Sequence, residues 1–159
     1  MGVKAHSVKV TMAYLQKFWK IAPEYCDHIR FLSKYASPNR KEIQDFQLRT
    51  QTAMITNNKQ KMTDAFKLLI KSQLKAAGIT FVMENLPQYA ERQCDGEIEK
   101  ITGKSMHDTM KQFGSVKDVV VFKNHAYVWF NNVNDSNYTH ALVNNMMIGN
   151  NIVSTAVVA

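Results

Sequence analysis

The stretch Lys123-Asn124-His125-Ala126-Tyr127-Val128-Trp129-Phe130 decides the fold that the sequence predicts. Its aromatic and β-branched side chains favour a strand. The run Val116 to Phe122 is also rich in β-branched residues, and only Lys123-Asn124 separates the two runs. Such a short connection is typical of a β-hairpin, and Asn124 tolerates the positive φ that the turn requires. We therefore expect two antiparallel strands here.

The residues around this hairpin predict further elements in the order βαββαβ. An apolar, β-favouring run, Ile79 to Met83, precedes the hairpin, and Ile152 to Val158 follows it. Gly114 is expected to end a helix over Met106 to Phe113, and Asp135 to cap a helix that continues to Asn145. We therefore expect an α+β, ferredoxin-like fold with a four-stranded antiparallel sheet over residues 79–159.

The polar stretch from Gln88 to Ser105 interrupts this order. It contains no apolar alternation that would indicate a strand. We expect two helical turns within it, one around Glu91 and one over Glu97 to Ile101.

The opening stretch resembles the octamer of the RNA-recognition-motif (RRM) family, Lys/Arg-Gly-Phe/Tyr-Gly/Ala-Phe/Tyr-Val/Ile-x-Phe/Tyr. Six of its eight positions fit. Phe81-Val82-Met83-Glu84-Asn85-Leu86 resembles the hexamer of the same family, and Phe113-Gly114 and Ile148-Gly149 add to the pattern. The resemblance covers residues 79–159 and implies a sheet that stacks RNA bases on its aromatic side chains. Residues 1–78 carry no such resemblance.

Alternation along the strands separates the side chains of the two sheet faces. Ala126, Val128 and Phe130 are expected to face the helices, as are Phe81 and Met83. The last strand is expected to present Val153, Thr155 and Val157 on the open face. The candidate nucleic-acid-binding residues on that face, by the resemblance, are Lys123, His125, Tyr127, Trp129, Phe122 and Val82.

Several residues of the open face differ from the family pattern. Val82 and His125 stand where aromatic residues are usual, and Asn124 stands in place of glycine. Glu84 adds a carboxylate, although affinity for nucleic acid depends largely on neutralised phosphates. A face this apolar also fits a protein partner or a homodimer contact, or a cover formed by helices of the first half.

The first 78 residues predict a basic helical region of four short segments. Tyr14 to Trp19 places aromatic residues on one face, and Pro23 is expected to end this segment. The third helix begins with Asn39 as its N-cap and Glu42 at the capping-box position. Gly78 stands where the last helix is expected to end.

The net charge of +7 is divided unevenly along the chain. Residues 1–75 hold 14 basic against 5 acidic side chains, whereas residues 76–159 hold 6 against 8. This asymmetry indicates an acidic partner for the first half, or an ordinary solvated helical surface. The candidate phosphate-binding residues there are Arg40, Lys41, Lys67, Lys71 and Lys75.

Other classes of protein find little support in the sequence. Cys26 and Cys94 lack CxxC spacing, so we expect free thiols and an intracellular place, in the nucleus or cytoplasm. No metal-ligand spacing, cofactor motif or catalytic constellation is present, so we expect no metal, no cofactor and no enzyme. No apolar run approaches the ~20 residues of a membrane span.

The sequence therefore predicts a non-catalytic protein that binds single-stranded RNA through the sheet face and the basic helical region. The alternative is an RRM-like protein-interaction or dimerisation module in a ribonucleoprotein, transcription or viral assembly.

Overall fold

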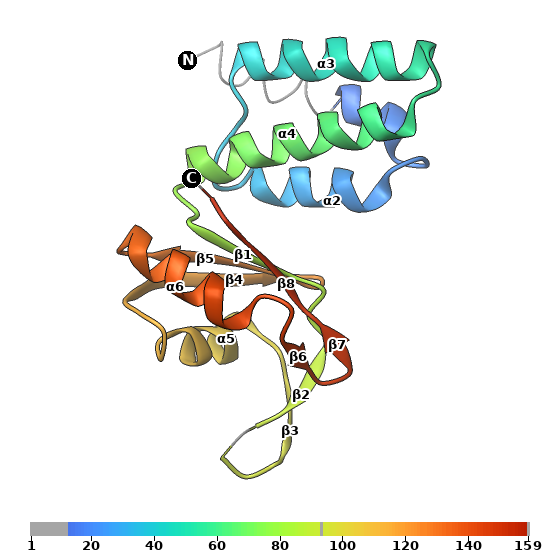
Figure 1. Cartoon of the computed structure of the whole chain (residues 1–159). Helices are drawn as coiled ribbons and strands as arrows, with labels where there is room; N and C mark the ends of the chain where they lie inside the picture. The colour runs from blue at the N-terminus through green and yellow to red at the C-terminus, as the bar shows by residue number, and fades with distance from the viewer. Residues whose placement is uncertain (1–12, 93, 159) are drawn as a thin grey trace. The chain divides into compact units, whose positions relative to one another are not determined.

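The structure is a computed structural model that describes residues 13–92 and 94–158. The chain divides into two compact units, residues 1–77 and residues 78–159, which we call the helical unit and the sheet unit (Figure 1). No helix in the described part of the chain is both long and apolar enough to cross a membrane.

The described residues of the helical unit include a short 3-10 helix, η1 (Gln16–Phe18), and the α-helices α2 (Pro23–Leu32), α3 (Arg40–Ile55) and α4 (Lys59–Ala77). The α4 helix packs against both α2 and α3. Leu15, Phe18 and Phe66 are fully buried at the centre of the unit. The first helical segment ends before Pro23, as predicted, and Pro23 itself begins α2, because proline fits a first helical position where no N–H is needed.

The start of α3 and the end of α4 are those that the sequence predicts. The Asn39 side chain accepts a hydrogen bond from the Glu42 N–H at 2.9 Å, and the Glu42 carboxylate accepts one from the Asn39 N–H at 3.3 Å. Gly78 follows α4 with a φ of 78°, a left-handed conformation that favours glycine. The capping box and the glycine stop are thus confirmed.

The sheet unit contains the predicted βαββαβ order. Its main elements are β1 (Phe81–Glu84), α5 (Gly103–Met110), β4 (Val116–Phe122), β5 (His125–Phe130), α6 (Val133–Val143) and β8 (Ser154–Val157). The four strands form one antiparallel sheet in the order β4-β5-β1-β8. Both helices cover the same face (Figure 1), where Met106 and Met110 of α5 and Val143 of α6 join the core. The α+β fold class is therefore confirmed.

The helical turns predicted around Glu91 and over Glu97 to Ile101 are wrong. Residues Tyr89–Glu91 form β2 and Ile98–Lys100 form β3, an antiparallel hairpin separate from the main sheet. Gly96, with a φ of 70°, allows the tight turn between them, and the Gly96 N–H donates to the Arg92 carbonyl at 2.8 Å. Local strand pairing thus outweighs the polar composition of this stretch.

Two helix starts also differ from the prediction. The α5 helix begins at Gly103 rather than Met106, because the Thr102 hydroxyl accepts a hydrogen bond from the Ser105 N–H at 3.1 Å. Asn132, rather than Asp135, caps α6. The Asp135 carboxylate instead accepts a hydrogen bond from the Ser115 N–H at 3.1 Å.

A second small hairpin precedes the last strand. It pairs β6 (Met147–Ile148) with β7 (Asn151–Ile152), so β8 begins at Ser154 rather than at Ile152. In the main hairpin the positive φ falls on Lys123, at 52°, and not on Asn124 as the sequence suggests. Lys123 is the first turn residue, where a type II′ turn requires a positive φ.

Candidate nucleic-acid interface

The strand register defines the open face of the main sheet. A central row of paired residues crosses all four strands. In this row Val120 of β4 pairs with Tyr127 of β5, Tyr127 pairs with Val82 of β1, and Val82 pairs with Ala156 of β8. The neighbouring residues Ala126, Val128 and Phe130 lie in the core on the opposite face, as predicted. The open face is therefore apolar along its middle.

The prediction for the last strand is wrong by one residue. Val153 lies in the core, and the Thr155 hydroxyl lies 2.6 Å from the His140 Nδ1 of α6. Val157 pairs with the core residue Phe81 and shares its face. Ser154 and Ala156 therefore occupy the open face in place of Val153, Thr155 and Val157.

Solvent exposure differs sharply among the six candidate residues of the open face. Tyr127 is only 1% exposed and Val82 4%. Burial, together with the nearby Glu84 carboxylate, raises the pKa of the Tyr127 phenol, so this group stays neutral. Phe122, His125 and Trp129 are half-buried, and Lys123 is exposed. Lys123 is therefore the one exposed residue among these six.

An edge row lies beside the central row and combines charge with aromatic rings. Phe122 pairs with His125 across β4 and β5. The Lys123 ammonium lies 5.8 Å from the centre of the Phe122 ring, within range of a cation–π interaction. The His125 Nε2 lies 3.7 Å from the Glu84 carboxylate of β1. This edge row, defined as Phe122, Lys123, His125 and Glu84, therefore holds one cation, one anion and two rings on which a base could stack.

The five basic candidates outside the sheet lie on the helical unit, and all are exposed: Arg40, Lys41, Lys67, Lys71 and Lys75. The three lysines recur every four residues on α4, a spacing that places successive side chains on the same side of a helix. Figure 1 shows that α3 begins at the end of the unit where α4 finishes, so Arg40 and Lys41 lie at the same end as Lys75. None of the five forms an ion pair with a described residue.

The candidates therefore fall into two groups, one on each unit. Five of the six sheet-unit residues lie on strands and share one face, as the alternation predicts, and Lys123 lies in the turn between β4 and β5. The five basic residues belong to the helical unit. The sequence analysis missed Ser154 and Ala156 on the open face. The run Val153 to Val157 favours a strand, but it does not indicate which alternate residues face the core and which face the open side. The pairing of β8 with β1 determines which of these residues face the core.

A depression of about 290 Å³ beside the start of α5 is lined by Gly103, Lys104, His107, Asp108, Asp118 and Val119. Within the described residues, no group of three or more histidine, cysteine or acidic side chains is placed to hold a metal ion.

Comparison with solved structures finds RNA recognition domains similar to about half of this chain. The RRM3 domain of Mip6 is 17% identical, with a TM-score of 0.40, and the match covers 50% of this chain and 93% of that domain. RNA recognition domains 1 and 2 of Sex-lethal from Drosophila melanogaster are 14% identical, with a TM-score of 0.40, over 49% of this chain and 48% of theirs. The RRM3 domain of Gbp2 is 14% identical, with the same TM-score, over 49% of this chain and 73% of that chain. No protein-family model matches the chain, and no curated protein is similar to it in sequence.

Proposed function

We propose that this chain is a non-catalytic RNA-binding protein that holds single-stranded RNA on the open face of its sheet and on its basic helical unit. The observation that carries the proposal is the edge row. There an exposed Lys123 stands beside two rings, Phe122 and His125, on a sheet of the βαββαβ order. A cation next to stacking surfaces is what a single strand of phosphates and unpaired bases requires.

The burial of Tyr127 sets the order of the proposed contacts. A ring that is 1% exposed offers no free surface for a base, although its place in the octamer is the one that suits stacking. We therefore assign the first contacts to Lys123, Phe122 and His125. Trp129 is half-buried and extends this set along β5, whereas Tyr127 and Val82 contribute only when the central row becomes accessible.

The helical unit would supply contacts to phosphate. Lys67, Lys71 and Lys75 have like charges one turn apart, an arrangement that mildly destabilises a helix unless an anion neutralises it. Like Arg40 and Lys41, they are exposed and have no carboxylate partner among the described residues. Such a surface binds phosphate independently of sequence.

Titration of fluorescently labelled single-stranded RNA at two salt concentrations tests the proposal. We expect Phe122→Ala to weaken binding by ~1–3 kcal/mol, because it removes a stacking surface. Lys123→Ala should weaken binding and reduce the salt slope by about one. The triple variant Lys67→Ala, Lys71→Ala, Lys75→Ala should reduce that slope further, by about two at most, since each phosphate contact to a single strand contributes about 0.7.

Lys111→Ala is the matched control, because Lys111 is exposed on the sheet unit but already pairs with Asp108 at 3.3 Å. It should bind like the wild type. The proposal fails if the wild type shows no salt-dependent binding, or if Lys111→Ala weakens binding as much as Lys123→Ala.

A second candidate function is a protein-interaction module that uses the same face. The exposed Glu84 carboxylate of the edge row favours it, because an acidic group at this edge suits a protein partner better than a polyanion. Sedimentation of the wild type beside Trp129→Glu tests whether that partner is a second copy of this chain. Dimerisation through the sheet face requires the wild type to self-associate and the Trp129→Glu variant to be monomeric.

A further inference from the structure

The turn between α3 and α4 holds two large apolar side chains in solvent. Ile55 is the last residue of α3 and, at 86% exposed, the most exposed large apolar side chain that the structure describes. Met54 beside it is 52% exposed. Backbone hydrogen bonds order the turn, since the Asn57 N–H donates to the Met54 carbonyl at 3.2 Å and the Asn58 N–H to the Ala53 carbonyl at 2.8 Å. An ordered backbone thus presents both side chains to solvent.

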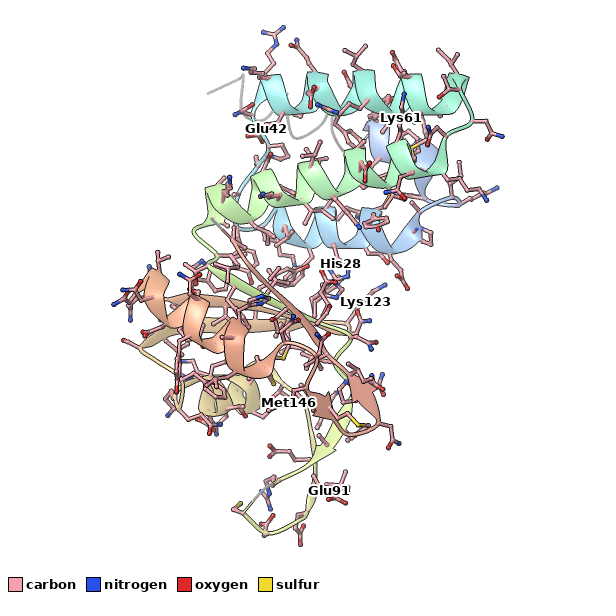
Figure 2. All side chains as sticks on the ribbon, viewed as in Figure 1. His28, Glu42, Lys61, Glu91, Lys123 and Met146 are labelled. Atoms are coloured by element: carbon pink, nitrogen blue, oxygen red, sulfur yellow. The ribbon has the colours of Figure 1, made fainter. Side chains whose placement is uncertain are left out.

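The same stretch of chain is basic. Residues 54–61 contain Lys59 and Lys61 and no acidic residue. Both lysines are exposed, and neither forms an ion pair with a residue that the structure describes. The first carboxylate further along α4, that of Asp64, accepts a hydrogen bond from the Gln60 side chain at 2.9 Å. Lys61 lies near the start of α4 in Figure 2. We define the turn surface as Met54, Ile55, Lys59 and Lys61.

The connection between η1 and α2 lies at the same end of the helical unit as the turn surface. The Tyr25 ring of α2 stacks on the Phe66 ring of α4, with 5.4 Å between their centres. Further along both helices, the Gln73 side chain donates to the Ile29 carbonyl at 3.1 Å. The two helices are therefore parallel, so α2 begins where α4 begins (Figure 1).

This connection adds side chains of the same two kinds. Ile21 is 65% exposed, and Lys20 beside it is exposed as well. Residues 19–26 and 52–62, which form this end of the unit, contain three lysines and one carboxylate, that of Glu24. The end as a whole is therefore basic and carries three exposed aliphatic side chains.

This combination fits a ligand that offers both negative charge and apolar groups. Phosphate alone would satisfy the lysines but would leave the aliphatic side chains in water. Residues 54–61 contain no aromatic ring on which a base could stack. An anionic lipid bilayer offers both partners, because its headgroups attract lysines and its acyl chains accept aliphatic side chains. A bilayer also deforms around protruding side chains, whereas a protein partner must supply a pocket of matching shape.

We propose that the turn surface docks this chain on an anionic membrane, with Met54 and Ile55 inserted at the boundary of headgroups and acyl chains. Lys59 and Lys61 bind the anionic headgroups. Residues 1–75, with 14 basic against 5 acidic side chains, attract such a membrane before contact. The contact is peripheral and reversible, since few apolar side chains are inserted. It leaves free the other end of the helical unit, which carries Arg40, Lys41 and Lys75.

Co-sedimentation of the full-length chain with lipid vesicles, without RNA, tests this proposal. We expect binding to phosphatidylcholine vesicles that contain roughly 30% phosphatidylserine, weaker binding at high salt, and little binding to phosphatidylcholine alone. Met54→Ser, Ile55→Ser removes the inserted side chains without a change of charge and should weaken binding at least roughly tenfold. Lys59→Ala, Lys61→Ala should weaken binding by roughly 25-fold at most, about fivefold for each lysine.

Each double variant has a matched control on the sheet unit. Leu142→Ser, Ile152→Ser truncates two exposed aliphatic side chains there, which are 48% and 57% exposed. Lys100→Ala, Lys104→Ala removes two exposed lysines. Both controls should bind the anionic vesicles like the wild type. Circular dichroism checks that every variant is folded.

The proposal is overturned if the wild type binds no anionic vesicles at low salt, which is the result that an acidic protein partner at this turn predicts. It is also overturned if Met54→Ser, Ile55→Ser binds the vesicles like the wild type, because the lysines alone would then suffice. A control that loses as much binding as its matched variant overturns it too. None of these samples contains RNA, and Met54→Ser, Ile55→Ser should retain RNA binding, so the two proposals fail independently.

Discussion

The His125 Nε2 lies 3.7 Å from the Glu84 Oε1 across the neighbouring strands β5 and β1. The carboxylate therefore lies in the edge row where we propose that RNA binds. We predict that Glu84→Gln tightens RNA binding roughly threefold at low salt, because it removes one negative charge near the phosphates without changing the shape of the side chain. The salt titration described above measures the effect.

Asp108→Asn is the control for this prediction, because it makes the same chemical change at an exposed position of α5 outside the edge row. Its affinity for RNA should equal that of the wild type within error. Equal or weaker RNA binding by Glu84→Gln would count against RNA at this edge of the sheet and in favour of a protein ligand.

Gly114 lies where the backbone passes close to α6. A Cβ added to Gly114 would lie 2.6 Å from the Asp135 Cβ, which is closer than packed carbon atoms approach. We predict that Gly114→Ala destabilises the protein by roughly 2–3 kcal/mol, because Asp135 must move and its hydrogen bond from the Ser115 N–H is lost. Urea unfolding measures the loss. Lys111→Ala, an exposed change nearby, should alter stability by less than about 0.5 kcal/mol.

The two cysteines differ in accessibility, since Cys26 is fully buried and Cys94 is exposed. Burial, with a smaller effect of Asp27, raises the pKa of the Cys26 thiol to about 11, so about 0.1% is thiolate at pH 8. We predict that Ellman's reagent modifies one thiol of the native protein quickly and both thiols in denaturant. Cys94→Ser should abolish the fast reaction. Two fast thiols in the native wild type would show that Cys26 is accessible.

The raised pKa of Cys26 also predicts a loss of stability in alkali. The folded state holds the thiol proton more tightly than the unfolded chain, where the pKa is near 9.0. This contribution is fully present below pH 9 and is lost as the pH rises from 9 to about 11, at a cost of up to roughly 2–3 kcal/mol. Cys26→Ala should be less stable at pH 7 but should lose less stability over that range. Parallel pH profiles of the two proteins would contradict the assignment.

The Asn39 capping box stabilises the start of α3. Asn39→Ala removes the side-chain oxygen that accepts the Glu42 N–H at 2.9 Å, so we predict a loss of about 1 kcal/mol in the free energy of unfolding. Asn39→Ser keeps an acceptor at this position and should retain most of that stability. An alanine variant as stable as the wild type would mean that water replaces the cap at no cost.

Alternation predicted both the two longest strands and which of their residues face the core. Val116 to Phe122 and His125 to Phe130 each span six residues or more, and their inward residues Val119 and Val128 lie in the core. The β2 and β3 strands were missed because each has only three residues, and half of these six are charged. In so short a hairpin the pairing across the turn, and not the pattern within each strand, determines the structure.

The candidate site could be predicted only as far as which face each residue occupies. Alternation placed Tyr127 on the open face, but it says nothing of solvent exposure, and Tyr127 is 1% exposed. The phase of β8 depends on the pairing of Thr155 with Met83 and on the contact between Thr155 and His140. Both contacts join residues far apart in the chain, and no local pattern encodes them. The assignment of Lys123, His125, Phe122 and Trp129 to RNA stays a prediction.

Lys123 occupies a left-handed position in the turn between β4 and β5, with a φ of 52°. A side chain there costs roughly 1 kcal/mol relative to glycine, which adopts this conformation freely. Lys123→Gly would therefore relax the turn and remove the exposed cation of the edge row in one step. The substitution to glycine would raise the stability of the protein but weaken its hold on an anionic ligand. A search for stabilising mutations would therefore select against the proposed RNA binding at this position.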